Sequence, residues 1–147
     1  MQVKVLIDKM YQDMEIHVCN DEMNSEVTGL ANAISGFVNK RLVGTDEKGN
    51  KVMLRPQEII RFYAQGQKVL AQDEKEIYSL HEKLYELEKI LDGMKFIRIS
   101  KSEIVNLKKV KKLDMNMVGT IKVILSDGTE TYTSRRNVMN LKKKLGI

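Results

Sequence analysis

Short runs of alternating hydrophobic and polar residues, separated by turn-forming residues, dominate the chain from residue 41 onward. In residues 120–134 two such runs flank Asp127-Gly128, a pair that favours the tight turn of a β-hairpin. Residues 41–55 repeat the pattern around the loop DEKGN. We predict further strands at residues 59–64, 67–72, 75–80, 96–100 and 110–115. The fold class is therefore mostly β (α+β), because strands outnumber the few helical segments.

Two segments of this region follow the helical period instead. HEKLYELEKILDG, residues 81–93, places its apolar side chains on one stripe and ends in Gly93, a residue typical of helix C-termini. RRNVMNLKKKLG, residues 135–146, does the same with Val138, Leu141 and Leu145. We expect Ser134 to cap this last helix. The apolar set of the first helix is Leu84, Leu87, Ile90 and Leu91.

Residues 1–40 form a different kind of segment. QVKVLI and MEIHVC alternate with the period of two expected of strands, and a helical stripe follows from Ser25 to about Lys40. We predict an N-terminal strand-helix extension over residues 1–40, used for dimerisation or a partner contact, and one further domain over residues 41–147. The helical stripe consists of Val27, Leu30, Ala31, Ile34, Phe37 and Val38.

The net charge of +5 is distributed unevenly. Residues 1–40 carry a net charge of −3, residues 41–94 a net charge of −1, and residues 95–147 a net charge of +9. A basic region of this kind is typical of a surface that binds nucleic acid, although a solvated basic face remains the alternative. One cysteine and no apolar run near the length of a membrane span predict a cytoplasmic protein that does not cross a membrane.

The chain lacks the residue patterns of enzymes and metal sites. His17 and His81 are far apart, and Cys19 beside His17 gives only two ligands of the four that zinc takes. No phosphate-binding glycine loop or nucleophile elbow is present. We therefore predict no catalytic residues, no metal and no cofactor.

The basic residues of the last third lie beside predicted turns. Arg98 and Lys101 flank Ser100 and Ser102, and Arg135-Arg136-Asn137 opens the last helix. Arginine can read guanine and asparagine can read adenine, whereas serine and lysine bind phosphates. This placement favours loops entering DNA over a helix-turn-helix. A second group of lysines follows at Lys108, Lys109, Lys111 and Lys112.

The stretch FIRISKSEIVNLKKV resembles the LytTR family of bacterial DNA-binding domains. It matches the pattern F-x-R-x-x-x-S-x-x-V-N, and it is followed by the hairpin with DG at its tip and by TSRRNVMNLKKKL. The upstream segments RPQEIIRFYAQGQKVLAQ and LHEKLYELEKIL agree, so the resemblance covers roughly residues 40–147. It implies an elongated stack of small β-sheets that binds tandem repeats of double-stranded DNA through loops in successive major grooves.

The resemblance also implies particular contacts. Carried over by position, DNA would be bound by Gln67 and Lys68 in a first loop and by Ser100 and Lys101 in a second, between buried anchors. Arg136 would read a base and Arg135 a phosphate, with Asn137 beside them at the start of the last helix. Arg98, Ser102 and Asn106 match signature positions, and for these DNA contact and structural hydrogen bonding both remain open. The anchors would be Phe96, Ile99, Ile104 and Val105.

The chain departs from the family pattern in two respects. Many members have histidine where Ser100 stands, and many carry a phosphoacceptor receiver domain, for which residues 1–40 are too short. The chain resembles the stand-alone subgroup, which implies a homodimer on DNA and a membrane-embedded regulatory partner protein. We predict a sequence-specific transcriptional regulator. The alternative is a protein-interaction module whose basic face binds an acidic partner.

Overall fold

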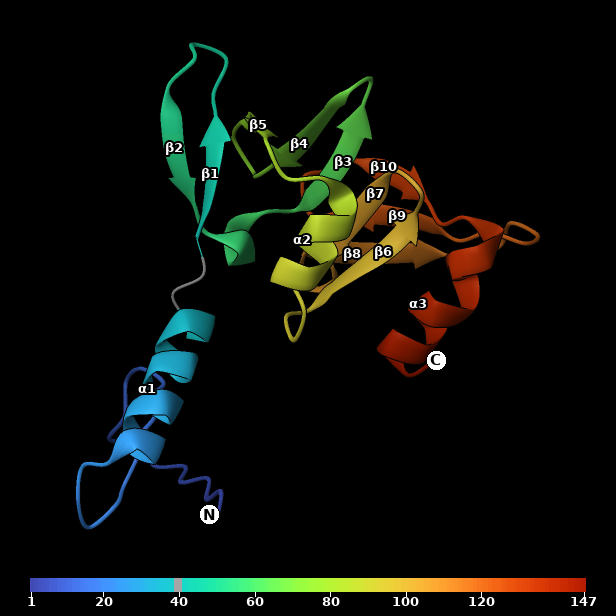
Figure 1. Ribbon diagram of the computed structural model, residues 1–147. Helices are drawn as coiled ribbons and strands as arrows, with labels where there is room; N and C mark the ends of the chain where they lie inside the picture. Colours follow the sequence, from blue (N-terminus) through green and yellow to red (C-terminus); the bar gives the residue numbers. More distant parts are fainter. Residues whose placement is uncertain (39–40) are drawn as a thin grey trace. The chain divides into compact units, whose positions relative to one another are not determined.

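The chain consists of two compact units, Met1–Asn39 and Lys40–Ile147. The computed structural model describes residues 1–38 and 41–147. In the larger unit, the described residues form two antiparallel sheets with short helices, as Figure 1 shows. The mostly β fold predicted from the sequence is confirmed.

The larger sheet has the strand order β2-β1-β5-β4-β3-β7-β6, and the smaller one has the order β10-β9-β8. Every neighbouring pair is antiparallel, so each connection needs only a turn or a short helix. The strands are β1 Leu42–Thr45, β2 Lys51–Leu54, β3 Arg61–Gln65, β4 Lys68–Gln72, β5 Ile77–Leu80, β6 Phe96–Ser100, β7 Glu103–Asn106, β8 Val110–Asp114, β9 Lys122–Leu125 and β10 Glu130–Tyr132.

Both predicted hairpins are present. In the β1–β2 loop, the Asp46 carboxylate accepts hydrogen bonds from the main-chain N–H groups of Lys48 and Asn50 at 2.9 and 2.8 Å. Hydrogen bonds from the main chain and side chain of Asn50 hold the pKa of Asp46 below its ordinary value. In the β9–β10 loop, Gly128 has a φ of 88°, which explains why glycine follows Asp127.

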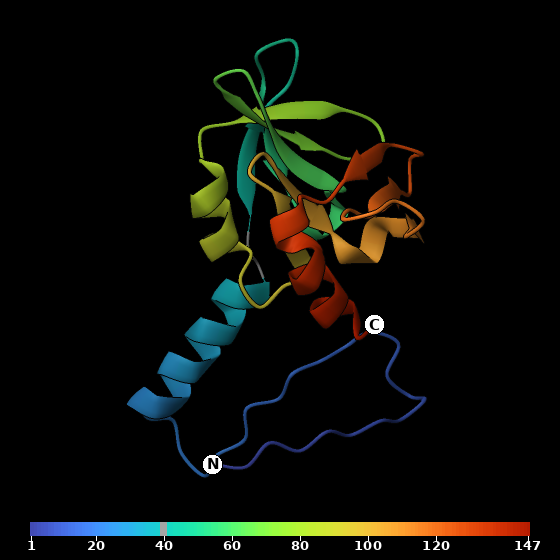
Figure 2. The same cartoon turned by 90° about the vertical axis from the view of Figure 1, so that its right-hand side faces the viewer.

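Two hydrophobic clusters stabilise the larger unit. The first packs helix α2 (Leu84–Ile90) on the larger sheet through the fully buried Leu87. In it, the rings of Phe62 and Phe96 are tilted against each other by 50° at a centroid separation of 5.6 Å. The second joins β6 and β7 to the smaller sheet and to helix α3 (Val138–Leu145), whose Leu141 is fully buried. Figure 2 shows α2 and α3 on separate parts of the unit.

The hairpin of β6 and β7 belongs to both clusters. Phe96 and Ile104 pack in the first, and Ile97, Ile99 and Val105 pack in the second. Every residue of β7 is buried as a consequence. The strand at residues 96–100 was predicted, but a polar loop was expected after it, and β7 was missed as a strand. A strand buried on both faces loses the alternation by which strands are detected.

A polar network links the larger sheet to the smaller one. Buried Glu103 forms an ion pair with Arg61 at 3.0 Å and accepts a hydrogen bond from Thr131 of β10. Arg61 also donates to Gln72 at 2.8 Å. Because both charges are paired and hydrogen-bonded, Glu103 can stay buried without a large desolvation cost.

The smaller unit differs from its prediction. Helix α1 (Ser25–Val38) is present, and Asn24 caps it through a hydrogen bond from the N–H of Val27 at 3.0 Å. The predicted end near Lys40 and the side chains of Phe37 and Val38 lie outside the described residues. Residues 2–19 form no strand, so the prediction of two strands there is wrong. Alternation alone is insufficient, because a strand needs a second strand to accept its backbone hydrogen bonds.

Candidate nucleic-acid interface

The turn between β6 and β7 presents Lys101 and Ser102 to solvent. The N–H of Ser102 donates to the Ser100 hydroxyl at 3.2 Å, which tightens the turn. The Arg98 side chain also stabilises this turn. Its Nε donates to the carbonyl of Ser100 at 2.7 Å, its Nη2 donates to the carbonyl of Lys101, and its Nη1 pairs with Glu88 of α2. Lys101 is therefore carried by a turn whose backbone is held in place.

The turn between β3 and β4 lies beside it. The main-chain N–H of Ala64 donates to the carbonyl of Ser102 at 2.8 Å, which joins the two turns. Gly66 has a φ of 61° and allows the chain to reverse. Gln67 and Lys68 follow it and are exposed. Two segments about 34 residues apart thus meet at one surface.

The two turns border an open depression of about 480 Å³. Besides Gln67, Lys68, Arg98 and Lys101, this depression is lined by Lys83 and Tyr85 from the start of α2. Lys83 was not among the contacts predicted from the sequence. The sequence around Lys83 does not indicate that this residue lies beside the two turns, because only tertiary packing brings α2 close to them.

The segment before α3 forms the third predicted contact region. Residues Arg135–Asn137 make a 3₁₀ turn, η3, which is joined to β6 by a hydrogen bond of 2.7 Å from the N–H of Ser134 to the carbonyl of Ile99. Arg135 and Arg136 are exposed, and Asn137 is half-buried. This hydrogen bond places η3 next to the residue that precedes Ser100.

The predicted cap by Ser134 is wrong. Its hydroxyl accepts a hydrogen bond of 2.7 Å from the side chain of Asn137, and its side chain caps neither η3 nor α3. The intervening 3₁₀ turn moves the first residue of α3 to Val138, which is too far along the chain for the usual cap spacing. Asn137 uses its side-chain amide to stabilise the turn that holds Arg136.

DNA contact and structural hydrogen bonding were both left open for Arg98, Ser102 and Asn106. The structure places these three residues in different surroundings. Asn106 is 2% exposed, donates to the carbonyls of Gln57 and Ile59 at 3.2 and 2.9 Å, and accepts from the N–H of Lys108 at 3.0 Å. Its side chain is therefore too deeply buried to contact the edge of a DNA base. Ser102 is exposed at the turn, and Arg98 is half-buried with its guanidinium engaged in the three interactions described above.

The lysines of residues 108–112 lie apart from these turns. Lys109 pairs with Glu74 at 3.7 Å, and Lys111 and Lys112 are exposed on β8. Lys122 of the neighbouring β9 pairs with Glu130 at 2.9 Å, and this hydrogen-bonded ion pair raises its pKa. These side chains contribute positive charge, but they do not line the depression.

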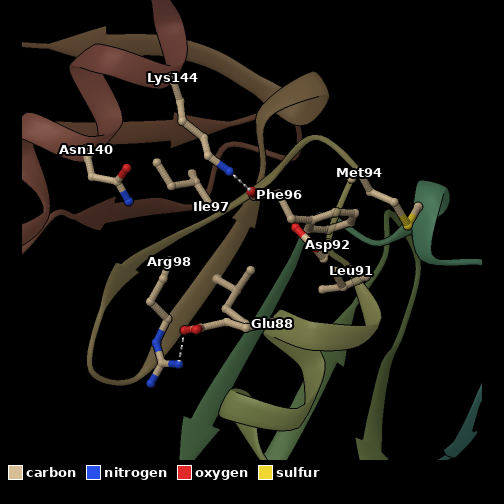
Figure 3. Close-up of a pocket in the computed structure, with 11 residues that line it drawn as sticks. Glu88, Leu91, Asp92, Met94, Phe96, Ile97, Arg98, Asn140 and Lys144 are labelled. Atoms are coloured by element: carbon tan, nitrogen blue, oxygen red, sulfur yellow. Dashed lines mark hydrogen bonds and ion pairs between the residues drawn. The ribbon is translucent and has the colours of Figure 1, made fainter.

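A second, smaller cavity of about 200 Å³ lies between α2, β6 and α3 (Figure 3). Its apolar wall includes Leu91, Met94 and Phe96, and the Glu88–Arg98 pair stands at its edge. Lys144 of α3 donates to the carbonyl of Phe96 at 3.2 Å.

No cluster of three or more potential metal ligands occurs in residues 1–38 and 41–147. His17 has Glu15 as its neighbour at 2.9 Å. Within the same described residues, no helix combines the length and the apolar character needed to cross a membrane.

Comparisons with known proteins agree on one family. The family model for the LytTr DNA-binding domain matches residues 49–146. Three proteins of Staphylococcus aureus, from strains MSSA476, MW2 and NCTC 8325, are each 33% identical over 148 residues, covering 100% of this chain and 99% of theirs. All three are named as uncharacterized transcriptional regulators of the helix-turn-helix type.

A solved structure supports the fold. The LytTr DNA-binding domain of a Bacillus cereus response regulator superposes with a TM-score of 0.69 at 20% identity, covering 74% of this chain and 99% of that one. In the described residues of our chain, β6 to β10 separate α2 from α3, so the larger unit contains no helix-turn-helix. The helix-turn-helix label of the relatives does not describe the architecture of this chain.

Proposed function

The chain belongs to the LytTR DNA-binding domain family, and from this we propose a sequence-specific transcriptional regulator that contacts double-stranded DNA through three exposed turns. The turns are the β3–β4 turn, the β6–β7 turn and η3. The observation that carries the proposal is their convergence on the β6–β7 hairpin, through the bonds from Ala64 to Ser102 and from Ser134 to Ile99. Because the turns are short and backed by buried strands, little ordering is needed on binding.

The contact set follows from exposure. Gln67, Lys68, Lys101 and Arg136 are exposed on these turns and are the side chains we propose to meet DNA, with Ser100 and Ser102 at the turn between them. Arg135 would bind a phosphate. Three other residues would stabilise the turns and would not contact DNA, because their polar groups already form hydrogen bonds within the protein. These residues are Arg98, Asn106 and Asn137. Turns of this length fit the major groove, and we propose that successive grooves of a tandem repeat are occupied.

Binding to two repeats would require two copies of the chain. We propose that the unit Met1–Asn39 supplies the contact between them. It is acidic, so it would be repelled by phosphate, and it exposes apolar side chains such as Val3, Val5 and Ile7, which are 89, 81 and 88% exposed. The relatives align over this segment too. A membrane-embedded regulatory protein is the other partner that this surface would suit, with the regulator acting in the cytoplasm.

Selection of bound fragments from random duplex DNA, followed by binding isotherms at several salt concentrations, tests the function. We expect one recovered motif, bound roughly 10³–10⁷ times more tightly than scrambled DNA, and a steep loss of affinity with salt. Lys101→Ala should weaken binding more than Lys112→Ala, which removes the same charge from the exposed face of β8. Equal affinity for all sequences would overturn the proposal and favour an acidic protein partner.

A further inference from the structure

Tyr85 is the exposed aromatic residue of the depression. Its side chain is 63% exposed, whereas Tyr78 is buried and Tyr63 is half-buried under the guanidinium of Arg61, at 4.1 Å from ring centroid to Cζ. Tyr85 lies on α2 and lines the depression together with Lys83 and with residues of the β3–β4 turn. An exposed tyrosine next to lysines is more typical of a binding surface than of a core edge.

The charge of the depression supports this reading. Lys68, Lys83 and Lys101 line it, and no acidic side chain does. Among the residues that the structure describes, these three lysines have no carboxylate within ion-pair distance. Three like charges around one hollow repel one another in the free protein, and a polyanion placed there would relieve that repulsion.

Helix α2 can hold the two side chains in position. Leu84 and Leu87 are 6 and 0% exposed and pack in the first hydrophobic cluster, and the Glu86 carboxylate accepts a hydrogen bond from the N–H of Lys83 at 3.1 Å. The Glu88–Arg98 pair ties the same helix to the β6–β7 turn. Lys83 and Tyr85 therefore lie at the start of a helix that is joined to the β6–β7 turn, one of the turns that we propose contact DNA.

We propose that Lys83 and Tyr85 form a fourth contact with DNA, directed at the phosphate-deoxyribose backbone outside the groove. The inference rests on the proposed function and deepens it. The Lys83 ammonium would bind a phosphate, and the Tyr85 hydroxyl would donate to a phosphate oxygen while its ring packs on a sugar. Backbone contacts fix the orientation of a protein on the duplex and carry no sequence information. This contact therefore adds affinity equally on all sequences.

The test compares Lys83→Gln with Lys89→Gln in the full chain. Lys89 is exposed in the last turn of α2 and lines neither cavity, so the second variant removes the same charge at a site outside the depression. Isotherms on the selected duplex and on scrambled duplex are measured at several salt concentrations. We expect Lys83→Gln to lower the slope of log affinity against log salt by about 0.9 on both duplexes. Lys89→Gln should leave it unchanged.

Tyr85 is tested by a pair of variants. Tyr85→Phe should lower affinity about twofold to tenfold on both duplexes through the lost hydroxyl, and Tyr85→Ala should lower it further. Melting temperatures equal to wild type exclude unfolding as the cause, as expected for an exposed side chain. A wild-type slope that is already flat would overturn the proposed function itself. A steep wild-type slope with equal slopes for Lys83→Gln and Lys89→Gln would overturn only the fourth contact.

Discussion

Arg136 is exposed on a turn whose backbone is held in place. Its turn is joined to Ile99 by the N–H of Ser134 and is followed by the buried Leu141. Arg135, one residue earlier, lies along Gly119, with its Nε 3.3 Å from the position that a Cβ would take there. The two arginines therefore lie in different surroundings, and we expect different effects from removing them.

We predict that Arg136→Ala costs about 1–3 kcal/mol on the selected DNA site and removes the preference at one base position, with less effect on scrambled DNA. Arg135→Ala should weaken all sequences alike and lower the salt slope by about one. Isotherms on selected and scrambled duplexes at two salt concentrations distinguish these outcomes. A uniform loss for both variants would show that Arg136 reads no base.

Tyr78 is a buried tyrosine whose pKa changes on folding. Burial, together with the negative charge of Asp73, raises the pKa of Tyr78 from 10.0 to about 12. As the pH rises from 10.0 to about 12, the unfolded chain releases this proton while the folded chain keeps it. The contribution of the group to stability is therefore fully present below pH 10.0 and is lost through this window.

Tyr78→Phe removes this titration. We expect the free energy of unfolding of wild type to fall more steeply than that of the variant between pH 10.0 and about pH 12, measured by urea denaturation. Tyr85→Phe is the control, since that hydroxyl is exposed. Parallel curves for wild type and Tyr78→Phe would contradict the assignment.

At the scale of the elements, Arg98 connects α2 to the β6–β7 turn. Its guanidinium meets Glu88 on the helix and the carbonyls of Ser100 and Lys101 on the turn. A fork-shaped donor can make these bonds at once, whereas a lysine ammonium is a single point of charge. The role we infer for Arg98 is to position Lys101, and its charge is already balanced by Glu88.

We predict that Arg98→Lys lowers affinity for the selected duplex roughly tenfold although the charge is kept, because the turn loses two of its hydrogen bonds. Glu88→Gln gives a sharper test. Removing a negative charge near the interface should strengthen DNA binding by electrostatics alone. Loss of the Glu88–Arg98 ion pair, which helps to hold the β6–β7 turn, should weaken DNA binding. We expect weaker binding on the selected duplex. Stronger binding by Glu88→Gln would show that Arg98 acts through its charge.

At the scale of the whole molecule, the two units are proposed to have separate tasks. The unit Lys40–Ile147 contains both hydrophobic clusters, all described strands and the three turns. The unit Met1–Asn39 carries a helix and exposed apolar residues, with a net negative charge. We therefore expect the larger unit to fold and to bind a half-site without the smaller one.

A truncated chain beginning at Lys40 should keep its affinity for a single repeat and lose cooperativity on two repeats. Isotherms on duplexes with one and two repeats measure this, and sedimentation of the full and truncated chains reports the oligomeric state. Retained cooperativity would assign the contact between copies to the larger unit. Loss of half-site binding by a truncated chain that still melts cooperatively would show that the smaller unit takes part in DNA binding.

Local patterns in the sequence predict most of the strands and both helices of the larger unit. Turn residues such as Asp127-Gly128 and alternating apolar positions are enough to predict hairpins, since a half-buried strand exposes every second residue. The stripe ending in Leu145 predicted α3, and the F-x-R-x-x-x-S-x-x-V-N pattern identified the family. The chemistry of the candidate contacts, with arginine and lysine at turns, could also be recognised there.

Only the tertiary structure decided which segments meet. Strand β7 was not predicted because the two hydrophobic clusters bury both of its faces, so its sequence does not alternate between apolar and polar residues. For Asn106 the sequence left both DNA contact and structural hydrogen bonding open, and in the structure its side-chain amide donates to main-chain carbonyls. Lys83 and Tyr85 gain their position from the docking of α2 beside turns that are close only in space. Residues 2–19 alternate like strands yet have no strand to pair with. Periodicity records which side of an element is buried, whereas pairing and docking depend on partners distant in the chain, which no local pattern contains.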